Sequence, residues 1–383
     1  METVNQRHKY DIGSLLGEYK EVLQQKYRMS YDQDKAIKDL IKCRTAQNGG
    51  HTRQCAECGH QEQAYNSCRN RHCPKCQFTK QVQWVDKLKS ALPSVRYNHI
   101  VFTIPASLHR LFFTNQRFCY DLLMKTSGKA LKQVVCSKFN PTIDIGAIMV
   151  LHTWGQALTY HPHVHMLVPA GGLTEDRMEW IHASKKFFLP VKILSRVFRG
   201  MFCRRIKQGI KSGELHLPKD IEWTDLRDQL YAKDWNVHIK PALSGPEKVL
   251  EYLGRYTHRV AIANERITKV TSGKVFFRIK DYRLNGNIRT MDLPVIEFLR
   301  RFLQHVLPGG FYKIRYIGFF AHRLIGELGG QALALLEQTP YIPEFEGLTS
   351  IEVYSALSGK RYACCPACEN GRLIPVHLMA APT

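Results

Sequence analysis

A cysteine- and histidine-rich block between residues 43 and 76 constrains this chain more than any other feature. It contains two Cys-x2-Cys pairs, Cys55/Cys58 and Cys73/Cys76, separated by fourteen residues. Both thiolates of such a pair can reach one tetrahedral Zn²⁺ ion at about 2.3 Å. The block is poor in aliphatic residues, so a metal must supply the stability that a hydrophobic core would otherwise give. Four thiolates leave no open position, and we expect one structural zinc on these two pairs.

Further potential ligands interleave with these pairs. We expect a second, Cys2His2-type zinc on Cys43, His51, Cys68 and His72. The alternative is that both histidines lie on the surface of a basic loop and both cysteines are small core residues. Near the other end of the chain, Cys364, Cys365 and Cys368 form a half-site without an obvious second pair, and we expect free thiols there, with a metal-binding role as the alternative.

The charge of the chain points to a polyanionic partner. Lys and Arg number 55 against 33 Asp and Glu, a formal net charge of +22, which favours nucleic acid or an anionic membrane surface. No apolar run approaches the roughly 20 residues that span a bilayer, and the first ten residues lack the apolar core of a signal peptide. We therefore expect a cytoplasmic protein without a membrane partner, in which twelve cysteines favour metal ligation over disulfides.

Hydrophobic periodicity predicts segregated helices and antiparallel strands, which is an α+β fold. Helices are expected over residues 10–42, 106–138, 191–213, 246–258 and 295–306. Strands are expected over 95–104, 145–154, 163–168 and 312–320, with a β-meander over 266–270, 274–282 and 287–291.

Two groups of basic residues are candidates for contacts with DNA. The helix at 191–213 carries seven cations and no acid, among them Arg204, Arg205 and Lys207, with Phe198 and Phe202 interleaved. A solvated charged face is the alternative. Beside the cysteine pairs, a zinc-stabilised fold would present Arg69, Arg71 and Lys75 to phosphates.

The segment His163-Val164-His165 places two imidazoles on one face of a strand, because side chains at i and i+2 share a face. Such a pair can chelate one divalent cation and leave positions open for substrate oxygens. Two neutral core histidines are the alternative, but their polar rings would then need partners.

Tyr252 and Tyr256 lie four residues apart on the helix opened by Pro246, and so on one face of it. Two core aromatics are the alternative. Arg255 and Arg259 add cations suited to phosphate beside them.

These features together resemble the HUH endonuclease superfamily, and more closely the two-tyrosine, rolling-circle insertion-sequence transposases. The resemblance runs through most of the chain and rests on the segments 66–76, 161–165, 251–259 and 299–302. It implies a five-stranded antiparallel sheet whose central strand carries the histidines, with Mg²⁺ or Mn²⁺ bound. A third ligand comes from the preceding strand in many members. Gln156 fits that place best, and His161 is the other candidate.

The resemblance also implies the function. Tyr252 and Tyr256 would be nucleophiles that nick and rejoin single-stranded transposon ends and target DNA through a 5′-phosphotyrosine. The expected domains are a zinc-binding, DNA-binding domain at 1–92, an HUH nuclease domain at 93–292 and a helical, basic region at 293–383. A plasmid or phage replication initiator and a non-catalytic, zinc-dependent nucleic-acid-binding protein are the alternatives.

Overall fold

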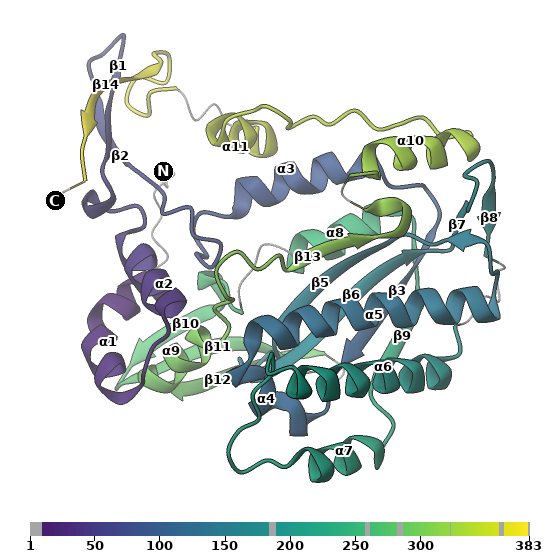
Figure 1. Ribbon diagram of the computed structural model, residues 1–383. Coiled ribbons are helices and arrows are strands. Elements are labelled where there is room, and N and C mark those ends of the chain that lie inside the picture. The colour runs from purple at the N-terminus through teal and green to yellow at the C-terminus, as the bar shows by residue number, and fades with distance from the viewer. Residues whose placement is uncertain are drawn as a thin grey trace.

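An antiparallel sheet of five strands lies at the centre of the protein (Figure 1). The computed structural model describes residues 10–183, 189–256, 261–281, 286–321, 323–359 and 364–381. The strand order is β13-β5-β6-β3-β9. The strands are β3 (Arg96–Thr103), β5 (Ala147–Trp154), β6 (Tyr160–Pro169), β9 (Val237–Ser244) and β13 (Ile314–Ile317). The expectation that the histidine strand is central in a five-stranded sheet is confirmed, because β6 carries His163 and His165.

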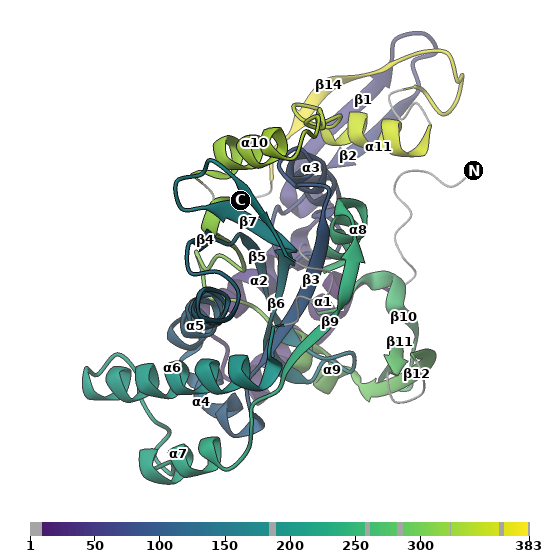
Figure 2. The ribbon, with the colours of Figure 1, turned by 90° about the vertical axis from the view of Figure 1, so that its right-hand side faces the viewer.

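Helices cover both faces of this sheet (Figure 2). On one face, α5 (Gln116–Lys138) and α6 (Val191–Lys211) pack against the side chains of Val164, Met166 and Val168. On the other face, α3 (Phe78–Lys89), α8 (Pro246–Tyr256) and α10 (Ile325–Leu335) contribute to a second apolar cluster with Leu167. The alternation of β6 therefore assigns His163 and His165, which share the parity of Leu167, to the face that carries α8.

The N-terminal block combines a helix pair with a small sheet. The elements are α1 (Ile12–Lys26), α2 (Tyr31–Lys42), β1 (Gly50–Cys55) and β2 (Gln61–Tyr65). Ser30 and Gln33 form a reciprocal capping box at the start of α2, which fixes where the second helix begins. The third strand of the small sheet is β14 (Leu373–Met379), which pairs antiparallel with β1.

The expected β-meander is present as β10 (Ile267–Thr271), β11 (Lys274–Asp281) and β12 (Asn287–Pro294). Ser272 and Gly273 both have positive φ, which is the two-residue hairpin turn that matches strand twist. The chain then continues into α9 (Val295–Leu303), whose buried residues join the core of α1 and α2.

Residues 293–383 contribute to several parts of the fold. They are divided between α9 in the N-terminal core, β13 at the edge of the central sheet and β14 in the small sheet. The physical reason is that each of these elements is short and buries its apolar side only against a partner far away in the sequence. Periodicity identifies an element, but it does not identify that partner.

The remaining elements are peripheral. They are α4 (His109–Thr114), α7 (Trp223–Tyr231), α11 (Ser350–Ser358), β4 (Ile143–Asp144), β7 (Gly171–Thr174) and β8 (Trp180–His182), with short 3-10 turns at Ala46–Asn48, Ala106–Leu108, Asn264–Arg266 and Gly318–Phe320. Within the described ranges, none of the helices has the length and apolar character that crossing a membrane requires.

Candidate functional site

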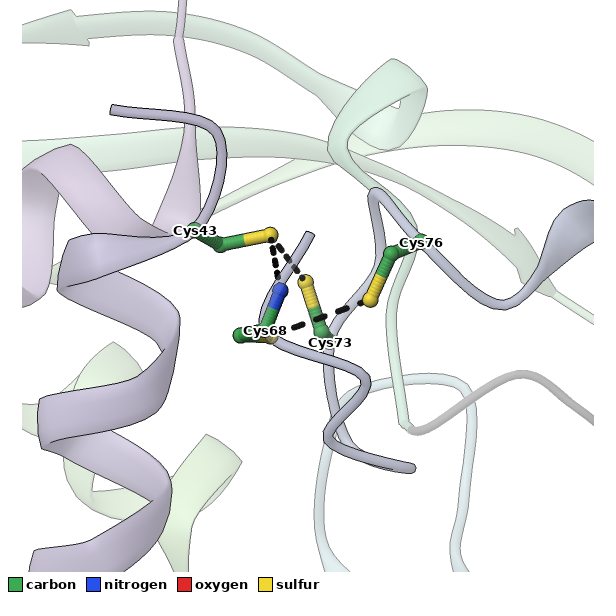
Figure 3. Close-up of side chains that lie close together, drawn as sticks. All are labelled: Cys43, Cys68, Cys73 and Cys76. Carbon is green, nitrogen blue, oxygen red and sulfur yellow. Dashed lines mark hydrogen bonds between the residues drawn. The ribbon is translucent and has the colours of Figure 1, made fainter. Parts of the chain in front are cut away.

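A four-cysteine cluster lies between the end of α2 and the start of α3 (Figure 3). Its members are Cys43, Cys68, Cys73 and Cys76, whose Sγ atoms all lie within 4.8 Å of one another. The Sγ atoms of Cys43 and Cys73 are 3.5 Å apart, and those of Cys68 and Cys76 are 3.7 Å apart. Four ligands placed about 2.3 Å from a tetrahedral zinc ion are separated by about 3.8 Å. The donor set and its spacing therefore fit a closed, structural zinc site.

Hydrogen bonds inside this cluster shift the pKa values of its thiols in opposite directions. Bonds from the thiols of Cys68 and Cys73 hold the pKa of Cys43 below its ordinary value. The backbone N–H of Cys68 donates to the same sulfur at 3.5 Å. The same bonds between thiols raise the pKa values of Cys68 and Cys73, so they favour the thiolate, which is the metal-binding form, at Cys43 but not at those two residues.

The structure divides the cysteines differently from the sequence expectation. Cys55 and Cys58 do not lie with Cys73 and Cys76, because β1 and β2 form a hairpin that carries the first pair away. Those two cysteines lie instead with Cys365 and Cys368, which were expected to be free thiols.

The expected Cys2His2 site is also wrong. His51 lies on β1, opposite Ala64 and Leu378, and belongs to neither cysteine cluster. His72 is buried, and its Nε2 accepts the backbone N–H of Leu307 at 3.4 Å. Burial holds its pKa well below the ordinary value. A histidine between two cysteine ligands thus serves the packing of the block against the rest of the protein.

A cluster of histidines forms the second candidate site, on the face of the central sheet that carries α8. His152, His163 and His165 each present a ring nitrogen within 4.8 Å of the other two. The Nε2 atoms of His163 and His165 are 3.0 Å apart. His152 lies directly opposite His163 in the pairing of β5 with β6, which explains why the third imidazole joins the pair.

Two imidazoles of this cluster, His163 and His165, are neutral and so can offer a nitrogen lone pair to a metal ion. Burial lowers the pKa of His163 to about 4 and the pKa of His165 well below its ordinary value. The Nδ1 atom of His163 lies 2.6 Å from the carbonyl oxygen of His161, which can only accept a hydrogen bond. Nδ1 therefore carries the proton, and the lone pair of Nε2 faces the cluster, as a metal ligand requires.

A fourth histidine, His99 on β3, orients the pair. Its Nε2 lies 2.8 Å from Nδ1 of His165 and its ring stacks on that of His165. Burial lowers the pKa of His99 to about 4, so this ring too is neutral. A hydrogen-bond partner on the far nitrogen of a ligating histidine fixes its tautomer and ring orientation.

Sequence reasoning missed His152 and His99 and chose Gln156 or His161 instead. Gln156 lies in the turn between β5 and β6, where its carbonyl accepts a hydrogen bond from Arg266 at 2.9 Å. His161 is the second residue of β6, and its carbonyl accepts a hydrogen bond from the Nδ1–H of His163. The signal for His152 was present, since it lies within the expected strand 145–154. Using it required the register of the hairpin.

The helix that carries the two tyrosines packs near the histidines. Val249, Leu250 and Leu253 of α8 belong to the same apolar cluster as Leu167 of β6. Tyr252 and Tyr256 lie on this helix as expected. Their side chains, that of Arg255, and Arg259 as a whole lie outside the described residues.

The basic residues near the cysteines have divided roles. Arg69 is exposed. Arg71 instead donates hydrogen bonds to the carbonyls of Leu307, Pro308 and Phe311. Lys75 forms an ion pair with Asp11 at 2.5 Å. Of the three side chains expected to face phosphates, two are thus engaged in holding the block together.

The basic helix α6 presents an exposed face to solvent. Arg204, Arg205 and Lys207 are exposed, and Arg205 forms an ion pair with Glu214 at 2.8 Å. The two interleaved aromatics, Phe198 and Phe202, are fully buried in the core beneath. The expectation that these aromatics contribute to nucleic-acid binding is wrong, because both rings are fully buried in the core and neither is accessible to a nucleic acid.

Comparison with known proteins gives two family matches and two close relatives. Residues 15–104 match the family described as "Transposase zinc-binding domain", and residues 146–325 match the family described as "Putative transposase". The "Putative transposase y4qJ" of Sinorhizobium fredii (strain NBRC 101917 / NGR234) is 38% identical over 365 residues, covering 93% of this chain and 92% of the relative. The "Transposase for insertion sequence element IS801" of Pseudomonas savastanoi pv. phaseolicola is 29% identical over 296 residues, covering 76% and 71%. No solved structure matches.

Proposed function

Because this chain belongs to the two-tyrosine insertion-sequence transposases that carry an N-terminal zinc-binding domain, we propose that it nicks and rejoins single-stranded DNA through a 5′-phosphotyrosine. The observation that carries this proposal is the shared face of the central sheet. His152, His163 and His165 lie on that face, and the helix with Tyr252 and Tyr256 packs over it. This shared face supports a single site to which the helix and the strands contribute the proposed nucleophiles and metal ligands.

His152, His163 and His165 would hold a divalent cation, which supplies polarisation of a phosphate oxygen and offsets the charge that develops at phosphorus. Of the two cations expected, Mn²⁺ suits three imidazole nitrogens better, because Mg²⁺ strongly prefers oxygen ligands. His165 then turns its proton toward His99, since its Nδ1 lies 2.8 Å from the Nε2 of that ring. His99 acts here as a positioning residue.

The two tyrosines act as the nucleophiles. The phenolic oxygen of one attacks the phosphorus, forming the tyrosine ester and breaking the bond to the 3′ oxygen. The phenol loses its proton and the 3′ oxygen gains one, so the products are a 5′-phosphotyrosine and a free 3′-hydroxyl. The energy of the broken bond stays in the ester, which allows the reverse reaction to join a new 3′-hydroxyl. A second tyrosine can cleave again while the first holds its strand.

A doubly labelled oligonucleotide tests the chemistry. Single-stranded DNA from an end of the flanking element, with different dyes on its 5′ and 3′ ends, is incubated with protein and Mn²⁺ or Mg²⁺. Covalent transfer of only the 3′ dye to the protein is the expected result. Tyr252→Phe with Tyr256→Phe should abolish the adduct, whereas Tyr231→Phe on the exposed surface of α7 should not. Adduct at the wild-type level in the double variant would refute the assignment.

The same assay distinguishes a DNA-cleaving enzyme from a non-catalytic binding protein, and His152 from Gln156 as the third metal ligand. Salt-sensitive retention of DNA without any adduct would identify a non-catalytic binding protein. For the ligands, loss of a group that hydrogen-bonds to a metal-bound histidine typically weakens metal binding about 10- to 100-fold. His152→Ala removes a proposed ligand itself, so it should raise the cation concentration needed for adduct formation by at least that factor. Gln156→Ala is the matched control and should behave as wild type, because its carbonyl, not its side chain, makes the contact described above.

A further inference from the structure

A second cluster of four thiols joins the two ends of the chain. Cys55 ends β1 and Cys58 follows it, whereas Cys365 and Cys368 precede β14. The sequence separation is 307 residues for Cys58 and Cys365 and 313 residues for Cys55 and Cys368. The Sγ atoms of Cys55 and Cys368 are 3.6 Å apart, as are those of Cys58 and Cys365. All four lie within 4.8 Å of one another. These spacings again match the edge of about 3.8 Å of a tetrahedral zinc–thiolate site, and are too long for disulfide bonds.

The two cysteine pairs have the same backbone geometry. In the first pair, the N–H groups of Glu57 and Cys58 point at Sγ of Cys55, at 3.4 and 3.5 Å. The first turn closes with the N–H of Gly59 donating to the carbonyl of Cys55, and Gly59 has a φ of 73°.

The second pair shares three of these features: an N–H two residues on that points at the first sulfur, a backbone bond from four residues on, and a positive φ at that fourth residue. The N–H of Ala367 points at Sγ of Cys365, and that of Gly371 at Sγ of Cys368, both at 3.3 Å. Glu369 donates to the carbonyl of Cys365 and has a φ of 59°. A left-handed backbone is unfavourable for glutamate, so this turn must be held in place by something beyond local preference.

Strand pairing brings the two turns together. Cys55 lies opposite Leu373 in the β1–β14 pairing, and Ala56 donates its N–H to the carbonyl of Arg372 at 3.1 Å. A Cβ on Gly371 would lie 2.3 Å from Sγ of Cys55, so only glycine allows the second turn this close. The local apolar cluster contains little besides Leu373 and the cysteines themselves. A metal ion is the element that would stabilise it.

We propose that Cys55, Cys58, Cys365 and Cys368 hold a second structural zinc ion that fastens the segment 364–381 to the N-terminal block. Two of its ligands lie beyond residues 15–104, the part of the chain that matches the zinc-binding family. The site is independent of the histidine cluster and of DNA cleavage. Its closed set of four thiolates gives it a structural role.

Zinc content of the purified protein, after dialysis against a mild chelator, tests the site. Wild type should hold two ions per chain. Cys58→Ser and Cys368→Ser should each hold one, and the combined variant should also hold one, because both residues serve the same ion. Cys364→Ser, the neighbour outside the cluster, is the matched control and should hold two. One ion in wild type, or none in the combined variant, would overturn the proposal.

A measurement on the wild-type protein covers the case in which a variant fails to fold. Cys58 is exposed and Cys368 is half-buried, so bare thiols there would react readily with a maleimide. Zinc should protect both, and a strong chelator should make them reactive, as peptide mapping can follow. The half-buried Cys364 should react before chelation. Equal reaction rates for Cys58, Cys368 and Cys364 in zinc-loaded protein would contradict the site.

Discussion

Replacing Arg204, Arg205 and Lys207 with alanine removes three exposed cations from α6, the helix expected to contact the DNA backbone. The three are not equivalent. Arg205 is paired with Glu214 at 2.8 Å and lies over the ring of Phe118, whereas Arg204 and Lys207 have no ion-pair partner among the described residues. We therefore expect the triple variant to lose about two phosphate contacts rather than three.

The magnitude follows from counterion release. Each phosphate contact to a single strand contributes about 0.7 to the slope of log K against log salt concentration, so two lost contacts should flatten that slope by about 1.4. We take the variant and the wild type to bind DNA equally at 1 M salt. At 0.1 M salt the variant should then bind about 25-fold more weakly than the wild type, a difference of about 1.9 kcal/mol. At 0.4 M the loss should shrink to about fourfold.

Fluorescence anisotropy with a labelled single strand, titrated at several salt concentrations, measures this slope. A variant with Lys269→Ala and Lys274→Ala removes two exposed cations of the β-meander from another surface, and Lys274, like Arg205, is ion-paired, with Asp292 at 2.9 Å. An unchanged slope in the α6 variant would refute the assignment of the helix to DNA. An equal loss in both variants would attribute the effect to net charge.

Three further predictions concern stability, each measured by chemical denaturation. Phe298→Ala should cost about 3–5 kcal/mol, because the ring is fully buried where α9 meets α1 and the meander; a loss below 1 kcal/mol would contradict that packing. A hydrogen bond from Arg300 lowers the pKa of Glu297 to about 2, so the interaction stabilises the fold above the ordinary carboxyl pKa and is lost as pH falls toward 2. Glu297→Gln should thus cost about 1 kcal/mol at pH 7 and less at pH 3, and a constant cost would exclude ionisation as the cause. Gly318→Ala should destabilise more than Gly310→Ala, since both have positive φ but only the first would drive a Cβ into a backbone carbonyl.

The parts of the site set by local periodicity could be predicted from the sequence. Alternation along one strand placed His163 and His165 on a common face, and a helical spacing of four placed Tyr252 and Tyr256 on one helix. His152 could not be chosen in the same way. Its position opposite His163 depends on the register of the β5–β6 hairpin, and a slip of one residue would turn it to the other face.

The cysteine partners depend on contacts that are still less local. A Cys-x2-Cys pair specifies half of a zinc site, and its spacing does not say which other half completes it. Only fourteen residues lie between Cys58 and Cys73, yet the cluster of Cys58 is completed by Cys365, 307 positions along the chain. Only the pairing of β1 with β14 decides between these combinations.

That pairing also fixes an order of events during synthesis. A ribosome adds about 5–20 residues per second, so the 307 residues that separate Cys58 from Cys365 take roughly 15–60 seconds to appear. Throughout that interval β1 is paired with β2 on one side only, and its other edge is open. A nascent chain must keep this edge from other strands until residues 373–379 emerge. Chains whose translation stops earlier retain the open edge, which exposes them to aggregation and to proteolysis.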